Sequence, residues 1–160
     1  MLSIQVSDTK DFMSHLLSKD TFDHFYFIEA SIKMGVSYQI QGRINEGFYD
    51  TSVEQTLNRE FCYWKEVRHR IFDIIKGKRL PLSCKIVFGL PKQSISYLIA
   101  HSNSSFREED IEGLYVNILY DPKNLLITTG VSYKNFSLDK SLEYAFDEYL
   151  AKFLKEKADI

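Results

Sequence analysis

The sequence predicts an α+β fold built from two β-α-β-β-α units, with a mainly antiparallel or mixed sheet and helices packed on it. Several segments alternate apolar and polar residues with a period of two, which is typical of half-buried strands. Other segments repeat apolar residues every three or four positions, which is typical of amphipathic helices. The chain has 160 residues, of which 44% are hydrophobic and 26% charged, so it is long enough to bury a core of its own.

The first predicted unit has three strands and two helices. Ser7 or Asp8 can cap the first helix, Gly35 permits the tight turn of a hairpin, and Gly77 can end the second helix. We expect a loop over residues 45–57. The elements are expected at residues 2–6 (strand), 7–18 (helix), 22–34 (strand), 36–44 (strand) and 58–76 (helix).

The second predicted unit repeats this order. Pro91 suits the first turn of a helix, and Asp121-Pro122-Lys123-Asn124 has the composition of a type I turn between two strands. The elements are expected at residues 82–90 (strand), 91–100 (helix), 114–120 (strand), 125–131 (strand) and, after a cap at Ser137 or Asp139, up to 154 (helix). The repeated order indicates an internal duplication, with pseudo-repeats 1–78 and 82–158 inside one domain over 1–160.

Charge and cysteine content exclude several classes of protein. The formal net charge is −2, so we expect negligible binding to nucleic acid at physiological salt. Cys62 and Cys84 do not form a C-x-x-C pair, and we interpret them as free thiols of a reducing compartment, which predicts a cytoplasmic protein. No apolar run is long enough to predict a membrane span.

Four potential metal ligands recur along the predicted helix 58–76. Cys62, Glu66, His69 and Asp73 lie at i, i+4, i+7 and i+11, which would place them on one stripe. Glu66-x-x-His69 has the spacing used in di-iron bundles, but those need the motif on two helices. The alternative is a solvated face on which Glu66 pairs with Arg70 and His69 with Asp73. We expect no bound metal or cofactor, and these four residues are the candidates if a metal binds.

Lys76, Lys78, Arg79 and Lys85 are the candidates for phosphate or anion binding, because they form the basic cluster of the sequence. The cluster lacks the G-x-x-x-x-G-K pattern that wraps backbone N–H groups around a phosphate. Lysines near the end of a helix also have a simpler explanation in the helix dipole.

Phe25 and Phe27 are the candidate interface residues. Strand alternation over 22–34 would send them to the side opposite Tyr26, Ile28 and the other even-numbered apolar residues. Either a helix of the same domain covers them or they contact a partner. We expect a homodimer, or a complex with another protein, through this side of the hairpin or the strand edge beside it.

His24 is a candidate general base, because it would share the buried face of the predicted strand 22–34. The more ordinary interpretation is a core or rim histidine with one satisfied hydrogen bond.

Three groups of segments carry a resemblance to a known family. The segments are Asp20-Thr21-Phe22-Asp23-His24-Phe25, Ile75-Lys76-Gly77-Lys78 with Lys85-Ile86-Val87-Phe88, and Thr129-Gly130-Val131-Ser132 with Leu138-Asp139-Lys140. They resemble a bacterial domain family of unknown function, from anaerobic Gram-positive bacteria. The resemblance implies a bacterial cytoplasmic domain and no specific activity. The order of elements is also similar in topology to the halves of sliding clamps and TATA-binding proteins, which does not establish a function.

We expect a non-catalytic binding or assembly module. The sequence has a surplus of aromatic residues, 14% of the chain, and lacks both the G-x-S-x-G and the G-x-G-x-x-G motifs. A small enzyme or metal protein built on the stripe from Cys62 to Asp73 is the first alternative. A clamp-like or TATA-binding-like nucleic-acid module is the second.

Overall fold

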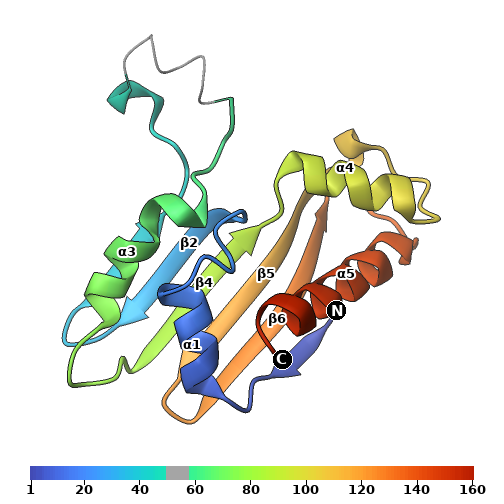
Figure 1. Cartoon of the computed structure of the whole chain (residues 1–160). Coiled ribbons are helices and arrows are strands. Elements are labelled where there is room, and N and C mark those ends of the chain that lie inside the picture. The colour runs from blue at the N-terminus through green and yellow to red at the C-terminus, as the bar shows by residue number, and fades with distance from the viewer. Residues whose placement is uncertain (50–57) are drawn as a thin grey trace.

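The computed structural model describes residues 1–49 and 58–160 and contains one six-stranded sheet with α-helices on one face (Figure 1). The sheet order is β1-β6-β5-β4-β2-β3, and every neighbouring pair is antiparallel. The strands are β1 (Ser3–Gln5), β2 (Tyr26–Lys33), β3 (Ser37–Gln41), β4 (Ser83–Gly89), β5 (Ile111–Asp121) and β6 (Asn124–Tyr133). The helices are α1 (Thr9–Leu17), α3 (Trp64–Ile75), α4 (Lys92–His101) and α5 (Ser141–Lys157), with 3-10 turns η1 (Glu46–Phe48) and η2 (Glu108–Asp110).

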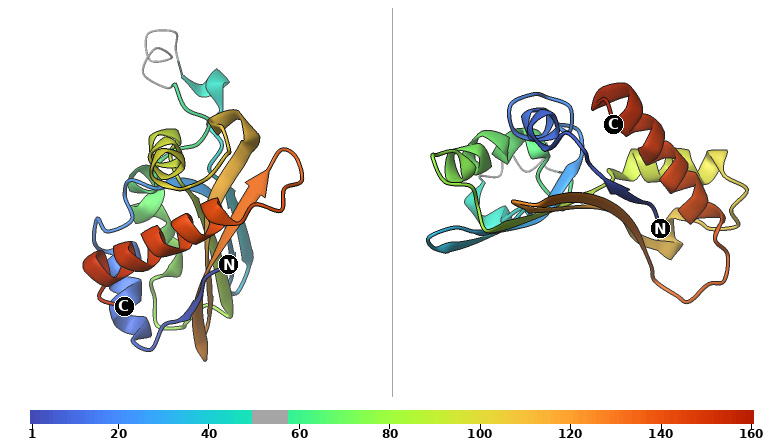
Figure 2. Two further views of the ribbon diagram at one scale, coloured as in Figure 1. Left: turned by 90° about the vertical axis from the view of Figure 1, so that its right-hand side faces the viewer. Right: turned by 90° about the horizontal axis from the view of Figure 1, so that it is seen from below.

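The helices lie on one side of a curved sheet, as the right-hand view of Figure 2 shows. Antiparallel sheets commonly pack one face on a core and leave the other polar. Here β4 directs Ile86 and Phe88 into the core, and α5 buries one stripe spaced at three and four residues. That stripe consists of Leu142, Phe146, Leu150 and Leu154. No helix in the described part of the chain is long and apolar enough to cross a membrane.

Aromatic rings occupy the centre of the core. Trp64 is fully buried and its indole Nε1 donates a hydrogen bond to the carbonyl oxygen of Leu16 at 2.8 Å. Its ring centre lies 5.0 Å from that of Phe88 and 5.6 Å from that of Phe27. The start of α3 is thereby fixed against both α1 and the sheet.

A partly buried ion pair reinforces the same junction. Arg68 of α3 donates to both carboxylate oxygens of Asp23, at 2.8 and 3.1 Å, and Asp23 is 5% exposed. Such two-point pairing is stronger and more directional than a single contact. It joins the turn before β2 to α3.

A β-bulge in β2 changes which residues face the helices. The register with β4 is continuous up to Phe27 and again from Glu29, so Ile28 is an extra residue. Phe27 before the bulge and Ile32 after it are both fully buried, although one is odd-numbered and the other even-numbered. The prediction of one uninterrupted alternation over 22–34 is therefore wrong.

Phe25 and Phe27 are core residues and do not form an exposed surface. They are 5% and 0% exposed, and their rings pack against Phe88 and Trp64, respectively. The predicted outward direction of these two rings is wrong, because the bulge places Phe27 on the helix side and Phe25 lies in the turn before β2. His24 lies in the same turn and is exposed, so it is not a buried base.

Helix α3 begins at Trp64, six residues later than the predicted start at residue 58. The preceding residues are extended, with Phe61 bridging to Arg43 and Tyr63 to Tyr26. The backbone N–H of Tyr63 donates to the carboxylate of Glu66 at 2.6 Å, which caps the helix there. Of the predicted loop 45–57, residues 50–57 lie outside the described residues, and Glu46–Phe48 form η1.

The predicted element order is correct, but the internal duplication is not confirmed. In the second half, β4, β5 and β6 are neighbours in the sheet. In the first half, β2 and β3 are neighbours, but β1 is separated from them and pairs with β6 at the opposite edge of the sheet. The two halves therefore do not build equivalent parts of the sheet.

Candidate functional site

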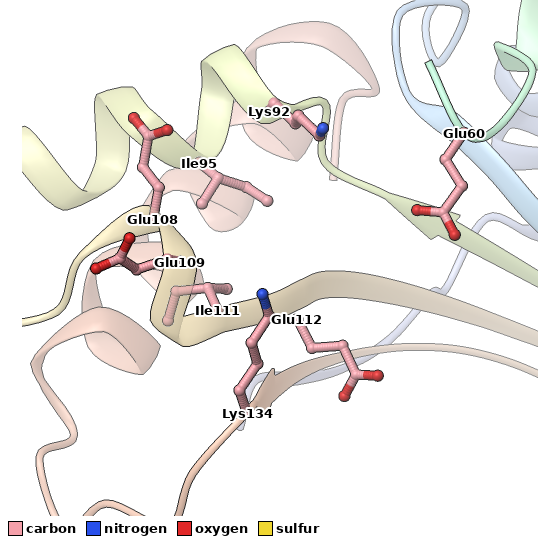
Figure 3. A pocket seen from close by; sticks show the side chains of 8 residues that line it. All are labelled: Glu60, Lys92, Ile95, Glu108, Glu109, Ile111, Glu112 and Lys134. Atoms are coloured by element: carbon pink, nitrogen blue, oxygen red, sulfur yellow. The ribbon is translucent and has the colours of Figure 1, made fainter.

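A charged pocket of about 450 Å³ lies at the end of the sheet where β4 passes into α4 (Figure 3). In the close-up, Glu60 approaches from one side, Glu108 and Glu109 lie on the other, and Lys92 extends toward the side of Glu60. The lining residues are Glu60, Lys92, Ile95, Glu108, Glu109, Ile111, Glu112 and Lys134.

A smaller hollow of about 70 Å³ shares Glu60, Lys92, Ile95 and Glu112 with this pocket and has an aromatic floor. We call the two together the Glu60–Glu112 pocket. Its floor residues are Tyr26, Ile28, Phe61, Gly89, Leu90, Gly113, Leu114 and Tyr115. Aromatic rings below carboxylates favour organic cations, because both present negative potential.

Gly113 is required for the position of the Tyr115 ring. A Cβ atom at Gly113 would lie 2.4 Å from both Cζ and the hydroxyl oxygen of Tyr115, closer than such atoms approach in proteins. The absence of a side chain at Gly113 lets Tyr115 lie over the backbone and line the pocket. A substitution at this position would displace the ring.

Glu60 already binds a cation together with an aromatic ring. Its carboxylate forms an exposed ion pair with Arg43, and the Arg43 guanidinium carbon lies 5.2 Å from the centre of the Phe61 ring. Arg59 lies in the same way over Tyr63, at 4.5 Å. The rings at this end of the sheet therefore accept guanidinium groups on their faces within the protein itself.

The carboxylates of Glu112 and Glu60 affect the pKa values of the tyrosines in the floor. Burial, then the carboxylates of Glu112 and Glu60, raise the pKa of the Tyr115 phenol above its usual value of 10.0. The pKa of Tyr26 is also raised, first by burial and then by Tyr63, with a contribution from Glu60. Glu112 is oriented by Ser132, whose hydroxyl donates to it at 2.7 Å. The pocket thus carries negative potential over its aromatic floor.

Two lysines partly offset this charge. Lys92 and Lys134 are exposed and have no ion-pair partner within 4.0 Å among residues 1–49 and 58–160. Of the four glutamates that line the larger pocket, Glu60 pairs with Arg43 and Glu109 with Arg107. Glu108 and Glu112 have no ion-pair partner within 4.0 Å among residues 1–49 and 58–160, so their carboxylates are available to a positively charged ligand.

The four residues of the predicted metal stripe do not come together as one group of ligands. Cys62 precedes α3, Glu66 accepts hydrogen bonds from both terminal nitrogens of Arg59, and Asp73 pairs with Lys76. Arg59 holds the pKa of the Glu66 carboxyl below its usual range. Glu66 pairs with Arg59 in the structure, whereas Arg70 was the partner expected in the ordinary alternative. His69 is exposed on α3.

The predicted anion cluster is divided between two places. Lys76 ends α3, and Lys78 and Arg79 follow in the exposed connection to β4. Lys85 lies on β4 and lines a separate hollow of about 560 Å³ on the uncovered face of the sheet, together with Lys33 and Asp121.

No pattern of residues in the sequence predicts the Glu60–Glu112 pocket. Its charged residues come from the connection before α3, the start of α4, η2, the start of β5 and the residue after β6. The surplus of aromatic residues was the available signal, since Tyr26, Phe61 and Tyr115 line the floor. Six of the twelve phenylalanines, by contrast, are buried in the core.

A comparison with protein families matches residues 15–159 to a family described as a family of unknown function (DUF5721). The chain belongs to this family. The match confirms the resemblance to a family of unknown function, and a bacterial origin stays a prediction. No curated protein and no solved structure matches the chain.

Proposed function

We propose that this domain is a non-catalytic binding module that receives a lysine or arginine side chain of a partner protein in the Glu60–Glu112 pocket. The observation that carries the proposal is the placement of two carboxylates around an aromatic floor, with Glu112 and Glu60 both raising the pKa of Tyr115 after burial. A cationic side chain would gain ion-pair and cation–π contacts together.

The Arg43–Glu60–Phe61 contact supports the choice of cation. It shows which groups this surface of the chain uses to hold a guanidinium, and Glu112 with Tyr115 offers a second pair of the same chemistry. All six charged side chains of the larger pocket are exposed, so the side chain of a macromolecule can reach them. Enclosed apolar pockets are more typical of small-molecule sites.

The charged residues on the uncovered face of the sheet do not favour binding of a nucleic acid. The uncovered face of the sheet carries Lys33 and Lys85 but also Glu29, Glu112 and Asp121, as the strand registers and lining residues place them. Binding to a polyanion needs a net positive surface. The nucleic-acid alternative therefore lacks the basic face that it would need.

An amide-resolved NMR titration tests the proposal with N-acetyl-lysine amide and N-acetyl-arginine amide as probes. We expect saturable shifts at the amides of Gly89 and Gly113, with a Kd on the order of 1–10 mM for such a small ligand. N-acetyl-glutamate amide should leave these signals in place. Equal responses to all three probes, or no response at the two glycines, would contradict the proposal.

Two variants make this titration specific. Glu112→Gln should weaken binding of the lysine probe by about threefold, and Glu60→Gln combined with it by about tenfold, because each removes one attraction of roughly 0.5–1 kcal/mol. Glu156→Gln is the matched control, since Glu156 is an exposed residue of α5 in the helical layer. An effect of the control as large as that of Glu112→Gln would count against the assignment.

A second candidate function is self-assembly through the edge strand β3. This strand, Ser37–Gln41, pairs with β2 on one side and with no strand on the other among the described residues. It contains neither a charged residue nor proline, the usual protections of an edge. Val36, just before the strand, is 63% exposed, and Tyr38, within it, is 38% exposed. A second copy could extend the sheet by pairing β3 with β3.

Light scattering at micromolar concentration tests this second function. A dimer should dissociate on Tyr38→Glu, because the two-fold pairing of one strand with itself would bring the new like charges close together. Tyr144→Glu on α5 is the control, since Tyr144 is 69% exposed. A monomer at all concentrations would exclude the dimer and leave the cation-binding function untouched.

A further inference from the structure

Three potential metal ligands meet where α1 passes the end of α5. The Nε2 atom of His15 lies 3.7 Å from a carboxylate oxygen of Asp11 and 3.7 Å from one of Asp159. One ligand atom from each residue lies within 4.8 Å of the others. Among the residues that the structure describes, no other three His, Cys, Asp or Glu side chains come together in this way.

His15 presents an unpaired nitrogen to this group. The residue is 6% exposed, and its Nδ1 lies 2.8 Å from the hydroxyl oxygen of Thr21. If Nδ1–H donates to Thr21, Nε2 keeps its lone pair. Nε2 has no hydrogen-bond partner among residues 1–49 and 58–160. Three acceptor atoms then face one another, an arrangement that a cation between them would satisfy.

Local structure places each of the three side chains. Asp11 and His15 are four residues apart on α1 and therefore share one face of the helix. Asp159 follows Ala158, the capping residue after the end of α5 at Lys157. Its φ of 56° lies in the left-handed region that residues after a helix end often adopt. This turn directs the chain back toward α1.

We propose that Asp11, His15 and Asp159 bind one divalent transition-metal ion of the Zn²⁺ type and that the ion fastens α1 to the end of α5. Zn²⁺ takes imidazole nitrogen and carboxylate oxygen at about 2.0–2.2 Å, so tetrahedral ligand atoms lie roughly 3.4 Å apart. This is close to the 3.7 Å that separates Nε2 of His15 from each carboxylate. Two carboxylates balance the charge of the ion. The imidazole favours a transition metal over Mg²⁺ or Ca²⁺.

The site has the supporting contact that metal-binding histidines commonly have. The second nitrogen of such a histidine usually donates to an oxygen atom, which fixes the ring and the tautomer, and Thr21 is in that position. Asp11 and Asp159 have side chains 42% and 79% exposed, so the remaining coordination position is open to water. The site is separate from the predicted stripe on α3 and independent of the Glu60–Glu112 pocket. A metal ion at this site departs from the expectation, drawn from the sequence, that the protein binds no metal.

The test uses the full chain without an affinity tag, stripped with a chelator and titrated with Zn²⁺ by calorimetry and with Co²⁺ by visible absorption. We expect one ion per chain with a Kd in the micromolar range or below, and tetrahedral Co²⁺ bands. Zn²⁺ at about a hundred times its Kd should raise the melting temperature by roughly 5–10 °C.

Variants identify the ligands. Asp159→Asn removes an exposed carboxylate without disturbing the core and should weaken binding at least tenfold, and His15→Gln should abolish it. Thr21→Val keeps all three ligands and should weaken binding about 10–100-fold through loss of the supporting contact. His69→Gln, an exposed histidine on α3, should bind as the unmodified chain does. Absence of saturable binding, unchanged affinity in Asp159→Asn, or loss of binding in His69→Gln would overturn the proposal.

Discussion

Two single-residue deletions in β2 should have opposite consequences for stability, because the strand contains one extra residue. Deletion of Ile28 removes the bulge residue and leaves the register of Phe27 and Glu29 with β4 continuous. Deletion of Ser31, three positions later, disturbs the alternation on the far side of the bulge. The pair thus compares the same loss of one residue at two points of one strand.

The cost of deleting Ile28 is small. The deletion removes the hydrogen bond from the Gly42 N–H to the Ile28 carbonyl oxygen, worth about 1 kcal/mol, and the burial of a half-buried side chain, worth about 1 kcal/mol. Phe27, Ala30 and Ile32 keep their places in the core. We expect a loss of about 2 kcal/mol in the free energy of unfolding.

The cost of deleting Ser31 is large, whichever way the strand responds. If the bulge persists, Ile32 turns outward and Lys33 enters the core in its place. If the bulge is lost instead, Glu29 takes the place of Ala30, which is 2% exposed. Either outcome buries a charged side chain, so we expect a loss of at least ~4 kcal/mol, a large part of the total stability of a domain.

Urea unfolding followed by far-ultraviolet circular dichroism measures both losses. The variant lacking Ile28 should unfold cooperatively at a slightly lower urea concentration, and the variant lacking Ser31 should be unfolded or nearly so in buffer. Equal losses for the two deletions would refute the assignment of the bulge to Ile28, and with it the reason given for the burial of Phe27.

Two further outcomes follow from the core. Asp23→Ala should cost about 3 kcal/mol in the free energy of unfolding, because it leaves the partly buried Arg68 without its partner. The control is Asp73→Ala on the exposed face of α3, which should leave urea unfolding unchanged. Burial raises the pKa of the Cys62 and Cys84 thiols to about 11. At pH 8 both thiols should therefore react with iodoacetamide about a hundredfold more slowly than in the urea-unfolded chain, as followed by mass spectrometry. Similar rates in the folded and unfolded states would contradict this.

The order of strands and helices could be predicted because it depends on short-range periodicity. Alternation identified β4, β5 and β6, and the apolar stripe identified α5. The faces of β2 could not be predicted, because the alternation over residues 22–34 is broken only at His24 in the sequence, while the structure inserts an extra residue at Ile28. Strand pairing at long range was also not predictable, and the pairing of β1 with β6 is what distinguishes the two halves.

Neither site could be derived from local patterns. Glu60, Glu112 and Lys134 are far apart in sequence and meet only through the sheet and its connections. His15 and Asp159 lie near opposite ends of the chain and meet where α1 and α5 do. The i, i+4 spacing of Asp11 and His15 was visible in the sequence, but its third partner was not.

The titration of the Tyr115 phenol, followed by NMR of its Cζ carbon, tests most directly whether the Glu60–Glu112 pocket attracts cations. The pKa should lie above 10.0 in the unmodified chain, through burial and then through Glu112 and Glu60. It should fall in Glu60→Gln/Glu112→Gln, since the phenolate loses two like-charged neighbours. Saturating N-acetyl-arginine amide, whose guanidinium keeps its charge throughout this pH range, should lower it in the unmodified chain. A Tyr115 pKa that neither the double substitution nor the arginine probe changes would contradict a cation-binding pocket.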